Sequence, residues 1–435
     1  MDGPHERRPF VTDAHPAAAL AEAIADRLAH PDAVPGPLSA EPWWRQSLAH
    51  GALSVALLHV ERAAAGLAPW QRAHDWLTYA TRTPLTAGVD SHLFHGAPAL
   101  AHVLACAATV RPGSYGRALD SLDRTITADA RLRLGFAQAR IDAGRLAALA
   151  EFDVIRGLSG IGSYLLRRDP GGETVRAILE YLVRLTKPMK INGETLPGWW
   201  VSSGPSGRDS DRFAGGHGNC GVAHGIGGPL ALLALAARRG IVVPGHREAI
   251  DRICAWLDRW RSDTEAGPLW PYWVNRPQLR AGHWDPCGPQ RPSWCYGTVG
   301  LARAQQLVAL ATGDADRRHM AEDALVRALA APRLRAVITD ASVCHGYAGL
   351  AHIATVVAFD ATPNVAARLR ALVPGLLDAV QPSGTDPEHV TAAFLSAVGC
   401  GPAFLEGAAG IALATLAPST HAPPCSGWDT CLLIT

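Results

Sequence analysis

The sequence predicts an all-α protein, an α/α toroid of seven helical hairpins with an inner and an outer ring of helices. Two observations lead to this prediction. Apolar residues recur at helical spacing in a 435-residue chain rich in Ala, Leu and Arg, with few β-branched runs. A short glycine pattern also recurs along the chain, and internal repeats of this length are typical of closed or stacked helical architectures.

The repeated pattern is a glycine, two residues, a second glycine or small residue, and then an apolar helical run. Glycine in a helix costs about 1 kcal/mol relative to alanine, so its repeated use at helix starts indicates a close approach between neighbouring helices. The intervals of 45 to 72 residues each have room for two helices, and their unequal lengths favour a closed double ring over an open solenoid. The seven copies begin at Gly51, Gly96, Gly157, Gly225, Gly297, Gly346 and Gly407.

The two residues before each first glycine have equivalent places in the seven repeats. If the repeats close into a ring, an equivalent place means an equal height, so these side chains converge at one end of a central cavity, where a binding site is expected. We therefore expect His50, His95 and Glu406 to open toward the same cavity end as the cysteines of this set. Directly before the glycine stand His50, His95, Arg156, His224, Tyr296, His345 and Glu406. One position earlier stand Ala49, Phe94, Ile155, Ala223, Cys295, Cys344 and Leu405.

Cys295 and Cys344 share a place in successive repeats, and His345 follows Cys344 directly. Two thiolates and one imidazole make a three-ligand zinc site whose fourth position stays open, as in catalytic zinc sites. The structural alternative is that the cysteines are small buried hydrophobes and the histidine a hydrogen-bonded core residue. Their shared place favours one zinc ion per chain. A second group, His217, Cys220 and His224, fits zinc spacing only loosely.

Composition excludes several other classes of function. The formal net charge is +1 and no long basic block occurs, so we expect no nucleic-acid partner. The N-terminal 35 residues lack the features of a signal peptide, and no apolar run is long enough to span a bilayer. We therefore expect a cytoplasmic protein that is not integral to a membrane, with its nine cysteines as free thiols. We divide the chain into a polar extension with a first helix, residues 1–40, and a single toroid domain, residues 41–435.

At several of these residues the sequence resembles the lanthionine synthetase C-like family, the cyclases of class I lanthipeptide biosynthesis. The combination of Trp294-Cys-Tyr-Gly with Cys344-His-Gly is highly specific. Pro292-Ser293 departs from the family, because many members have an aspartate after the residue that matches Arg291. The segments that carry the resemblance are Phe152–Gly160, Pro197–Trp200, Gly221–Pro229, Trp294–Gly300, Cys344–Gly349 and Gly427–Asp429.

The resemblance implies a seven-fold toroid with zinc on Cys295, Cys344 and His345. It also implies catalytic roles for Asp153 and His224, with Arg291 and Tyr296 nearby. The family reaction adds peptide cysteine thiols to dehydroalanine or dehydrobutyrine and forms thioether rings. The implied partners are a dehydrated precursor peptide, a separate dehydratase and a transporter.

The residues fit that chemistry. The thiolate is the nucleophilic form of cysteine, and zinc coordination deprotonates a thiol. Addition of the thiolate to the dehydro residue gives an enolate, which needs a proton. His224 can supply this proton near neutral pH; alternatively, His224 can take the proton of the thiol. Asp153 could orient His224; its structural alternative is a helix N-cap. A structural role is also the alternative for His224.

Two rival functions share these features. One is another zinc enzyme that alkylates thiols, such as a prenyltransferase-like protein, although no Asp-Asp pair for binding diphosphate occurs. The other is a non-enzymatic protein that binds a peptide or glutathione beside a retained zinc. An assay with a dehydrated peptide separates both from a cyclase.

Overall fold

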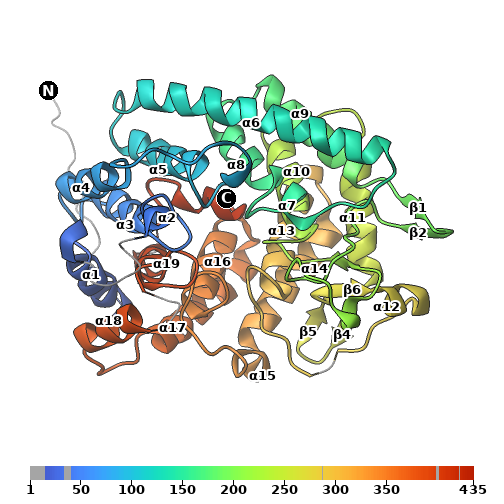
Figure 1. Cartoon of the computed structure of the whole chain (residues 1–435). Coiled ribbons are helices and arrows are strands. Elements are labelled where there is room, and N and C mark those ends of the chain that lie inside the picture. Colours follow the sequence, from blue (N-terminus) through green and yellow to red (C-terminus); the bar gives the residue numbers. More distant parts are fainter. Residues whose placement is uncertain (1–14, 34–40, 287, 398–400, 421) are drawn as a thin grey trace, which may run out of the picture.

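The computed structural model describes residues 15–33, 41–286, 288–397, 401–420 and 422–435. Its helices form an α/α toroid, as predicted (Figure 1). Each inner helix contacts the next one along the chain, and the last contacts the first, which closes the ring. The inner helices are buried over most of their surface, so they are apolar on nearly all sides. They are α3 (Ala52–Ala64), α5 (Ala97–Val110), α8 (Leu158–Arg168), α10 (Gly227–Arg238), α13 (Thr298–Thr312), α16 (Tyr347–Asp360) and α19 (Ala408–Thr420).

The outer helices bury one face against the inner ring and expose the other. Six inner helices pair with the outer helix that follows them in sequence, but α19 pairs with α1 from the opposite end of the chain. The seventh hairpin is therefore assembled from both termini. The outer helices are α4 (Trp70–Ala80), α6 (Gly116–Asp142), α9 (Glu173–Leu185), α11 (His246–Arg259), α14 (Ala315–Ala330), α17 (Pro363–Val380) and α1 (Ala17–Arg27).

Helix α1 lies within the span predicted as a polar extension, and it packs on α17, α18 and α19. The Leu28 carbonyl oxygen at its end accepts hydrogen bonds from His59 Nε2 and Trp76 Nε1, both at 2.8 Å. Much of the remaining extension, residues 1–14 and 34–40, lies outside the described residues. The domain boundary at residue 40 stays a prediction.

The repeated glycines have a different cause from the one that the sequence indicated. A Cβ on Gly160 would lie 2.1 Å from the carbonyl oxygen of Val154, and one on Gly349 would lie 2.0 Å from that of Val343. The close approach is thus mainly to the loop that precedes the same helix, and not to a neighbouring helix. In both repeats the amide of the second glycine donates to a carbonyl of that loop, Gly160 to Asp153 and Gly349 to Ser342.

Short elements complete the fold. Strands β3 and β6 pair antiparallel, with Asn219 opposite Trp273, and so join the loops before α10 and α13. Among the described residues no helix is both long enough and apolar enough to cross a lipid bilayer. The strands are β1 (Met189–Ile191), β2 (Glu194–Leu196), β3 (His217–Asn219), β4 (Ser262–Thr264), β5 (Gly267–Leu269) and β6 (Trp273–Asn275). The short helices are η1 (Pro31–Ala33), α2 (Pro42–Arg45), η3 (Gly88–Asp90), α7 (Leu149–Phe152), η4 (Asp211–Phe213), α12 (Arg276–Ala281), α15 (Pro332–Arg335), α18 (Pro387–Ser396) and η5 (Trp428–Leu432).

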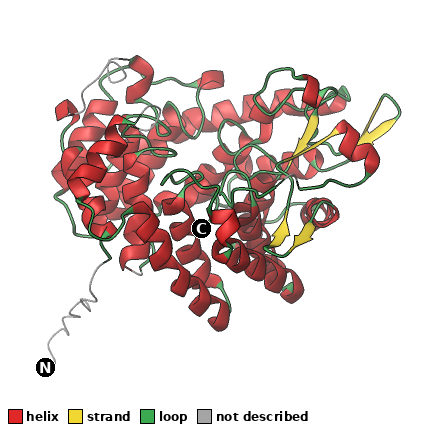
Figure 2. Ribbon diagram, turned by 90° about the horizontal axis from the view of Figure 1, so that it is seen from below, coloured by secondary structure: helices red, strands yellow, loops and turns green. Residues whose placement is uncertain are grey.

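The C-terminal segment, residues 425–435, runs into the middle of the ring, where both ribbon views place the C-terminus (Figures 1 and 2). Polar side chains of the inner ring hold it there, and all of them are fully or partly buried. The contacts are Glu61 to the amides of Cys425 and Ser426, His102 to the carbonyl of Trp428, Ser163 to that of Thr430, His352 to Asp429, Trp294 to the carbonyl of Leu432, and Arg303 to that of Ile434. The segment therefore ties helices from around the ring to one another.

Replacing Trp294 by Phe should lower the free energy of unfolding by about 1–3 kcal/mol, because the carbonyl oxygen of Leu432 loses the one side-chain donor that it has among the described residues. Chemical denaturation measures this difference. Trp43→Phe, at an exposed tryptophan, is the matched control and should change little. Equal stability of the two variants would contradict an anchoring role for the Trp294 bond.

Stability should also fall as the pH decreases below about 6.5. Burial lowers the pKa of His59 to about 4 and that of His102 to about 3. Above the pKa of histidine in the unfolded chain, about 6.5, these histidines are neutral in both the folded and the unfolded state, and their contribution to stability is fully present. Below this pH only the unfolded chain binds the protons. The free energy of unfolding then falls by about 1.4 kcal/mol per pH unit for each histidine, until the pH reaches the pKa in the folded state. Urea denaturation from pH 7 to pH 4.5 with a chelator present measures the slope. His102→Gln should flatten it, whereas the exposed control His319→Gln should not.

Candidate metal and catalytic centre

The seven loops before the inner helices are joined by main-chain hydrogen bonds at one level. In five of the links the amide two positions before a first glycine donates to the carbonyl of the equivalent residue in the next loop. This ladder of hydrogen bonds fixes the equivalent residues at equal height, as the repeat pattern predicted. The five links are Ala49 to Phe94, Ala223 to Cys295, Cys295 to Cys344, Cys344 to Leu405 and Leu405 to Ala49, at 2.9–3.4 Å.

A cavity of about 540 Å³ opens at this level. All seven residues directly before the first glycines line it, and so do all seven residues one position earlier. The prediction that His50, His95 and Glu406 open toward the same end as Cys295 and Cys344 is therefore confirmed. Trp43, Ser47, His92, Arg291 and Trp294 complete the wall.

Cys295, Cys344 and His345 come together on one side of this cavity. Their ligand atoms all lie within 4.8 Å of one another, and in the part of the chain that the structure describes no other group of His, Cys, Asp or Glu side chains has this spacing. Hydrogen bonds from Cys344 and His345 lower the pKa of the buried Cys295 thiol to about 5. The same bonds raise the pKa of Cys344 and that of His345. One ionised thiol of the pair is thus stabilised by the other thiol and by His345.

His345 has an acidic neighbour that the sequence analysis missed. Asp340 Oδ2 lies 3.4 Å from His345 Nε2, and Asp340 Oδ1 accepts from the amide of Ser342 at 2.8 Å. Histidines that bind metals usually have such a carboxylate or carbonyl partner, which fixes the orientation of the ring. The signal in the sequence is weak, because the place of Asp340, six residues before the first glycine, holds residues of different types in the other repeats, among them Asp90, Glu151 and Arg291.

Asp153 and His224 form a short hydrogen bond across two neighbouring loops. His224 Nδ1 lies 2.6 Å from Asp153 Oδ2, and the carboxylate is buried whereas the imidazole is partly exposed to the cavity. Asp153 Oδ1 accepts from the amides of Arg156 and Gly157 at 2.6 and 2.8 Å, just before α8. The carboxylate therefore caps its own loop with one oxygen and orients His224 with the other. This bond leaves Nε2 of His224 for the cavity.

Tyr296 lies between His224 and the cysteine cluster. Its ring stacks on the imidazole of His224, with ring centroids 6.4 Å apart and planes inclined by 28°. Asn219 Nδ2 donates to Tyr296 Oη at 3.1 Å, and burial raises the pKa of the phenol to about 12. Tyr296 therefore stays neutral and packs against His224. Asn219, from β3, is a second residue that the sequence analysis missed.

Arg291 lies in the cavity wall on the side of the cysteines. Its positive charge favours the ionised form of Cys295 and opposes protonation of His345. Its main chain is held from outside the cavity, since Tyr272 Oη donates to the Arg291 carbonyl oxygen at 3.2 Å. Among the described residues the guanidinium of Arg291 has no hydrogen bond or ion pair, so it is available to a ligand.

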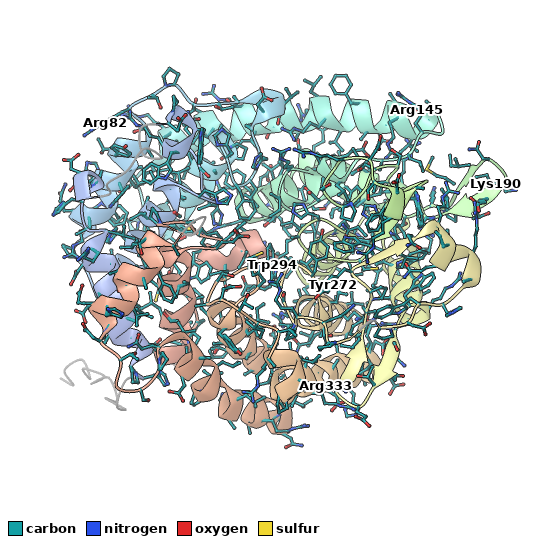
Figure 3. All side chains as sticks on the ribbon, turned by 60° about the horizontal axis from the view of Figure 1, so that its bottom comes forward. Arg82, Arg145, Lys190, Tyr272, Trp294 and Arg333 are labelled. Atoms are coloured by element: carbon teal, nitrogen blue, oxygen red, sulfur yellow. The ribbon has the colours of Figure 1, made fainter. Side chains whose placement is uncertain are left out.

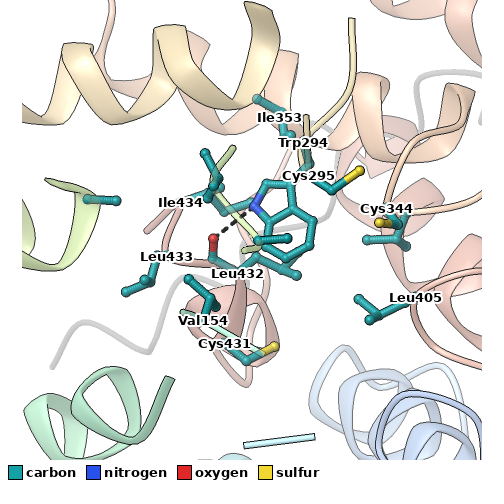
Figure 4. Close-up of a cluster of buried hydrophobic side chains, with 14 of the residues drawn as sticks. Val154, Trp294, Cys295, Cys344, Ile353, Leu405, Cys431, Leu432, Leu433 and Ile434 are labelled. Carbon is teal, nitrogen blue, oxygen red and sulfur yellow. Dashed lines mark hydrogen bonds between the residues drawn. The ribbon is translucent and has the colours of Figure 1, made fainter. Parts of the chain in front are cut away.

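The C-terminal segment reaches the residue next to the first cysteine. Trp294 Nε1 donates to the carbonyl oxygen of Leu432 at 3.0 Å, and in Figure 4 Cys295 follows directly on this anchored side chain, facing Cys344. Trp294 itself is buried. The loop that carries Cys295 is thus held by two contacts: the hydrogen bond from Trp294 to the C-terminal segment and the main-chain bonds to the neighbouring loops.

His217, Cys220 and His224 do not form a ligand group. His217 Nδ1 lies 2.9 Å from the carbonyl oxygen of Ser203, and Cys220 is a buried thiol whose pKa burial raises to about 12. His224 is turned toward Asp153 instead. The segment from Gly204 to Gly216 contains the short helix η4 and no other helix or strand.

Comparison with known proteins agrees with this architecture. The nisin biosynthesis protein NisC of Lactococcus lactis subsp. lactis is 28% identical over 246 residues, which cover 55% of this chain and 56% of that protein. The match thus spans about half the length of this curated relative. A solved structure of a nisin cyclase superposes with a TM-score of 0.73 and 22% identity, over 96% of each chain. The model of the lanthionine synthetase C-like protein family matches residues 42–433. The chain belongs to the lanthionine synthetase C-like family.

Proposed function

We propose that this chain is a zinc-dependent lanthipeptide cyclase, which adds cysteine thiols of a dehydrated peptide to dehydroalanine or dehydrobutyrine and forms thioether rings. The observation that carries the proposal is that the Cys295, Cys344 and His345 cluster and the His224–Asp153 pair face the same cavity. One side can activate a thiol and the other can move a proton, the two requirements of such an addition. Membership of the family and the similarity to NisC support it.

The donor set fits zinc. In a tetrahedral site with ligand atoms about 2.0–2.3 Å from the ion, the ligand atoms lie about 3.3–3.8 Å apart, so donors that lie within 4.8 Å of one another can converge by side-chain rotation. Two thiolates and one imidazole leave the fourth position open toward the cavity, as in a catalytic site. When bound there, zinc would supply the charge that deprotonates a peptide thiol.

The remaining chemistry belongs to side chains of this chain. The sulfur of the peptide thiolate attacks the β-carbon of the dehydro residue, and the electron pair of the double bond moves to the α-carbon and its carbonyl oxygen. Arg291, with its free guanidinium beside the cysteines, is placed to stabilise the negative oxygen of this enolate. A proton from Nε2 of His224 completes the α-carbon, and Asp153 on Nδ1 stabilises the imidazolium form that donates it. The proton that the peptide thiol releases passes to solvent, from which His224 is protonated again, so the addition involves no net loss or gain of protons. Tyr296 keeps the imidazole in place by stacking.

The proposed reaction also implies partner proteins and a location in the cell. Its substrate is a precursor peptide dehydrated by a separate dehydratase, and the cyclised product passes to a transporter. All these steps use an intracellular peptide, so we propose that the protein acts in the cytoplasm.

Purified protein should contain about one zinc per chain by elemental analysis, and Cys295→Ala or Cys344→Ala should lose most of it, because two donors hold zinc far more weakly than three. Cys254→Ala is the matched control: this thiol is also buried, on α11, but no ligand group includes it. Full retention of zinc by both cavity variants would refute the metal assignment.

His224→Asn should keep zinc content and peptide binding near normal and reduce cyclisation by roughly 10²–10⁴-fold, the usual loss for a general acid or base. Ring formation is followed by mass spectrometry with a thiol-alkylating reagent, against an uncatalysed control. Normal ring formation by His224→Asn would leave this histidine a structural residue. If the variant and the wild type both bind the peptide without forming rings, a non-enzymatic binding protein is the better description.

Asp153 tests whether its two oxygens have separate roles. Asp153→Asn retains an oxygen that can accept from the amides of Arg156 and Gly157, so stability should change little. The side-chain NH₂ group then replaces the oxygen that accepts from His224 Nδ1, so the orientation of the imidazole is lost and cyclisation should fall. Asp153→Ala should lower both. Combined with His224→Asn, Asp153→Asn should cost little more than the worse single variant, because the two act as a unit. Additive losses would indicate independent roles.

A further inference from the structure

Two surface hollows lie near the catalytic cavity. The first, of about 360 Å³, has an aromatic wall formed by Tyr272, Trp273 and Trp284. The second, of about 550 Å³, includes the charged side chains of Asp263, Glu265 and Arg333 and is referred to below as the polar hollow. Both are distinct from the cavity that holds the cysteine cluster.

The aromatic hollow adjoins residues of the cavity wall on one side and the polar hollow on the other. Tyr272 divides the cavity from the aromatic hollow, because its ring packs 5.6 Å from that of Tyr296 and its hydroxyl is bonded to Arg291, two residues of the cavity wall. Pro289 lines both the aromatic and the polar hollow. Figure 3 shows Tyr272 beside Trp294 near the middle of the ring and Arg333 farther toward the rim. The hollows thus form a track that leads outward from the site, referred to below as the Tyr272–Arg333 track.

The small volume of the catalytic cavity indicates what the track would bind. A cavity of about 540 Å³ lies in the range of pockets for small ligands, so it can hold the two reacting residues of a peptide and few others. The rest of a peptide substrate has to leave through the open mouth. A neighbouring wall of aromatic rings and prolines, Pro271 and Pro289 among them, offers flat apolar surface of the kind that extended peptides bind. Trp284 is held in this wall by a hydrogen bond from Nε1 to the carbonyl oxygen of Trp260 at 2.6 Å.

We propose that the Tyr272–Arg333 track binds the segment of the precursor peptide that adjoins the reacting residues. The inference rests on the proposed cyclase function and deepens it, since it assigns part of substrate recognition to residues outside the catalytic cavity. The aromatic hollow takes apolar or aromatic side chains of that segment, and the outer hollow takes its polar continuation. Binding there holds a flexible substrate near the cavity and thereby raises its effective concentration at the site.

Two synthetic dehydrated peptides test the proposal, one limited to the residues of a single ring and one carrying the natural flanking sequence on both sides. Trp284→Ala should raise KM for the long peptide about five- to tenfold, as expected when an aromatic anchor is removed, and leave KM for the short peptide and kcat for both unchanged. Phe136→Ala, at an exposed aromatic residue on α6, is the matched surface control. An equal effect on both peptides, or none, would overturn the track.

A second measurement does not depend on the folding of that variant. A photoreactive p-benzoylphenylalanine in place of the exposed Pro289 should crosslink to the flanking part of the long peptide, and unlabelled long peptide should suppress the crosslink. Absence of a crosslink, or one that the short peptide suppresses equally, would overturn the proposal. If wild-type protein cyclises neither peptide, the proposed function itself fails, whereas cyclisation of both with equal sensitivity to Trp284→Ala refutes the track alone.

Discussion

The main-chain hydrogen bonds between the seven loops are the constraint on which the site depends. They join Cys295 to Cys344, Cys344 to Leu405 and Leu405 to Ala49, so the loops of the last and first repeats are linked directly. Buried amide and carbonyl groups need partners, and in six of the seven junctions between neighbouring loops the next loop supplies one; between the loops of Phe94 and Ile155 the described residues show no such bond. Because only backbone atoms take part, the side chains at this level are free to differ. The ring therefore fixes height and spacing, while the chemistry is set by residue type.

The same loops explain why five of the seven repeats carry two glycines. The chain before each inner helix folds back over its first turn, and the backbone there lies too close for a side chain at Gly160 or Gly349. Position −4 relative to the first glycine often supplies a polar cap, as Ser47 and Ser342 do for the amides of His50 and His345. Asp153 has this same position and makes the same kind of bond. Its carboxylate has a second oxygen left for His224, which a serine would not offer.

These features also show how far sequence alone could lead. The toroid, the shared height of His50, His95 and Glu406, and the approach of Cys295 to Cys344 and His345 all followed from repeat phase. Asp340 and Asn219 were missed although both stand six residues before a first glycine, because the residue type at that place varies from repeat to repeat and their contacts to His345 and Tyr296 appear only in the folded chain. Pairing of α19 with α1 was likewise hidden, since the two helices lie at opposite ends of the chain. The cause assigned to the glycines was wrong because a helix propensity does not reveal which backbone lies nearby.

Neighbouring loops meet the geometric demands of the proposed reaction. The β-carbon that receives sulfur and the α-carbon that receives a proton are bonded to each other, so thiol activation and proton donation must act within a short distance. His224 and Cys295 belong to adjacent repeats, and the amide of Ala223 donates to the carbonyl of Cys295. On the other side of Cys295, Trp294 is tied to Leu432 of the C-terminal segment. The loop that carries both Cys295 and Tyr296 is therefore held at two points. These contacts restrict movement of the cysteine cluster relative to His224, and an addition of this kind requires that its reacting groups keep such a fixed arrangement.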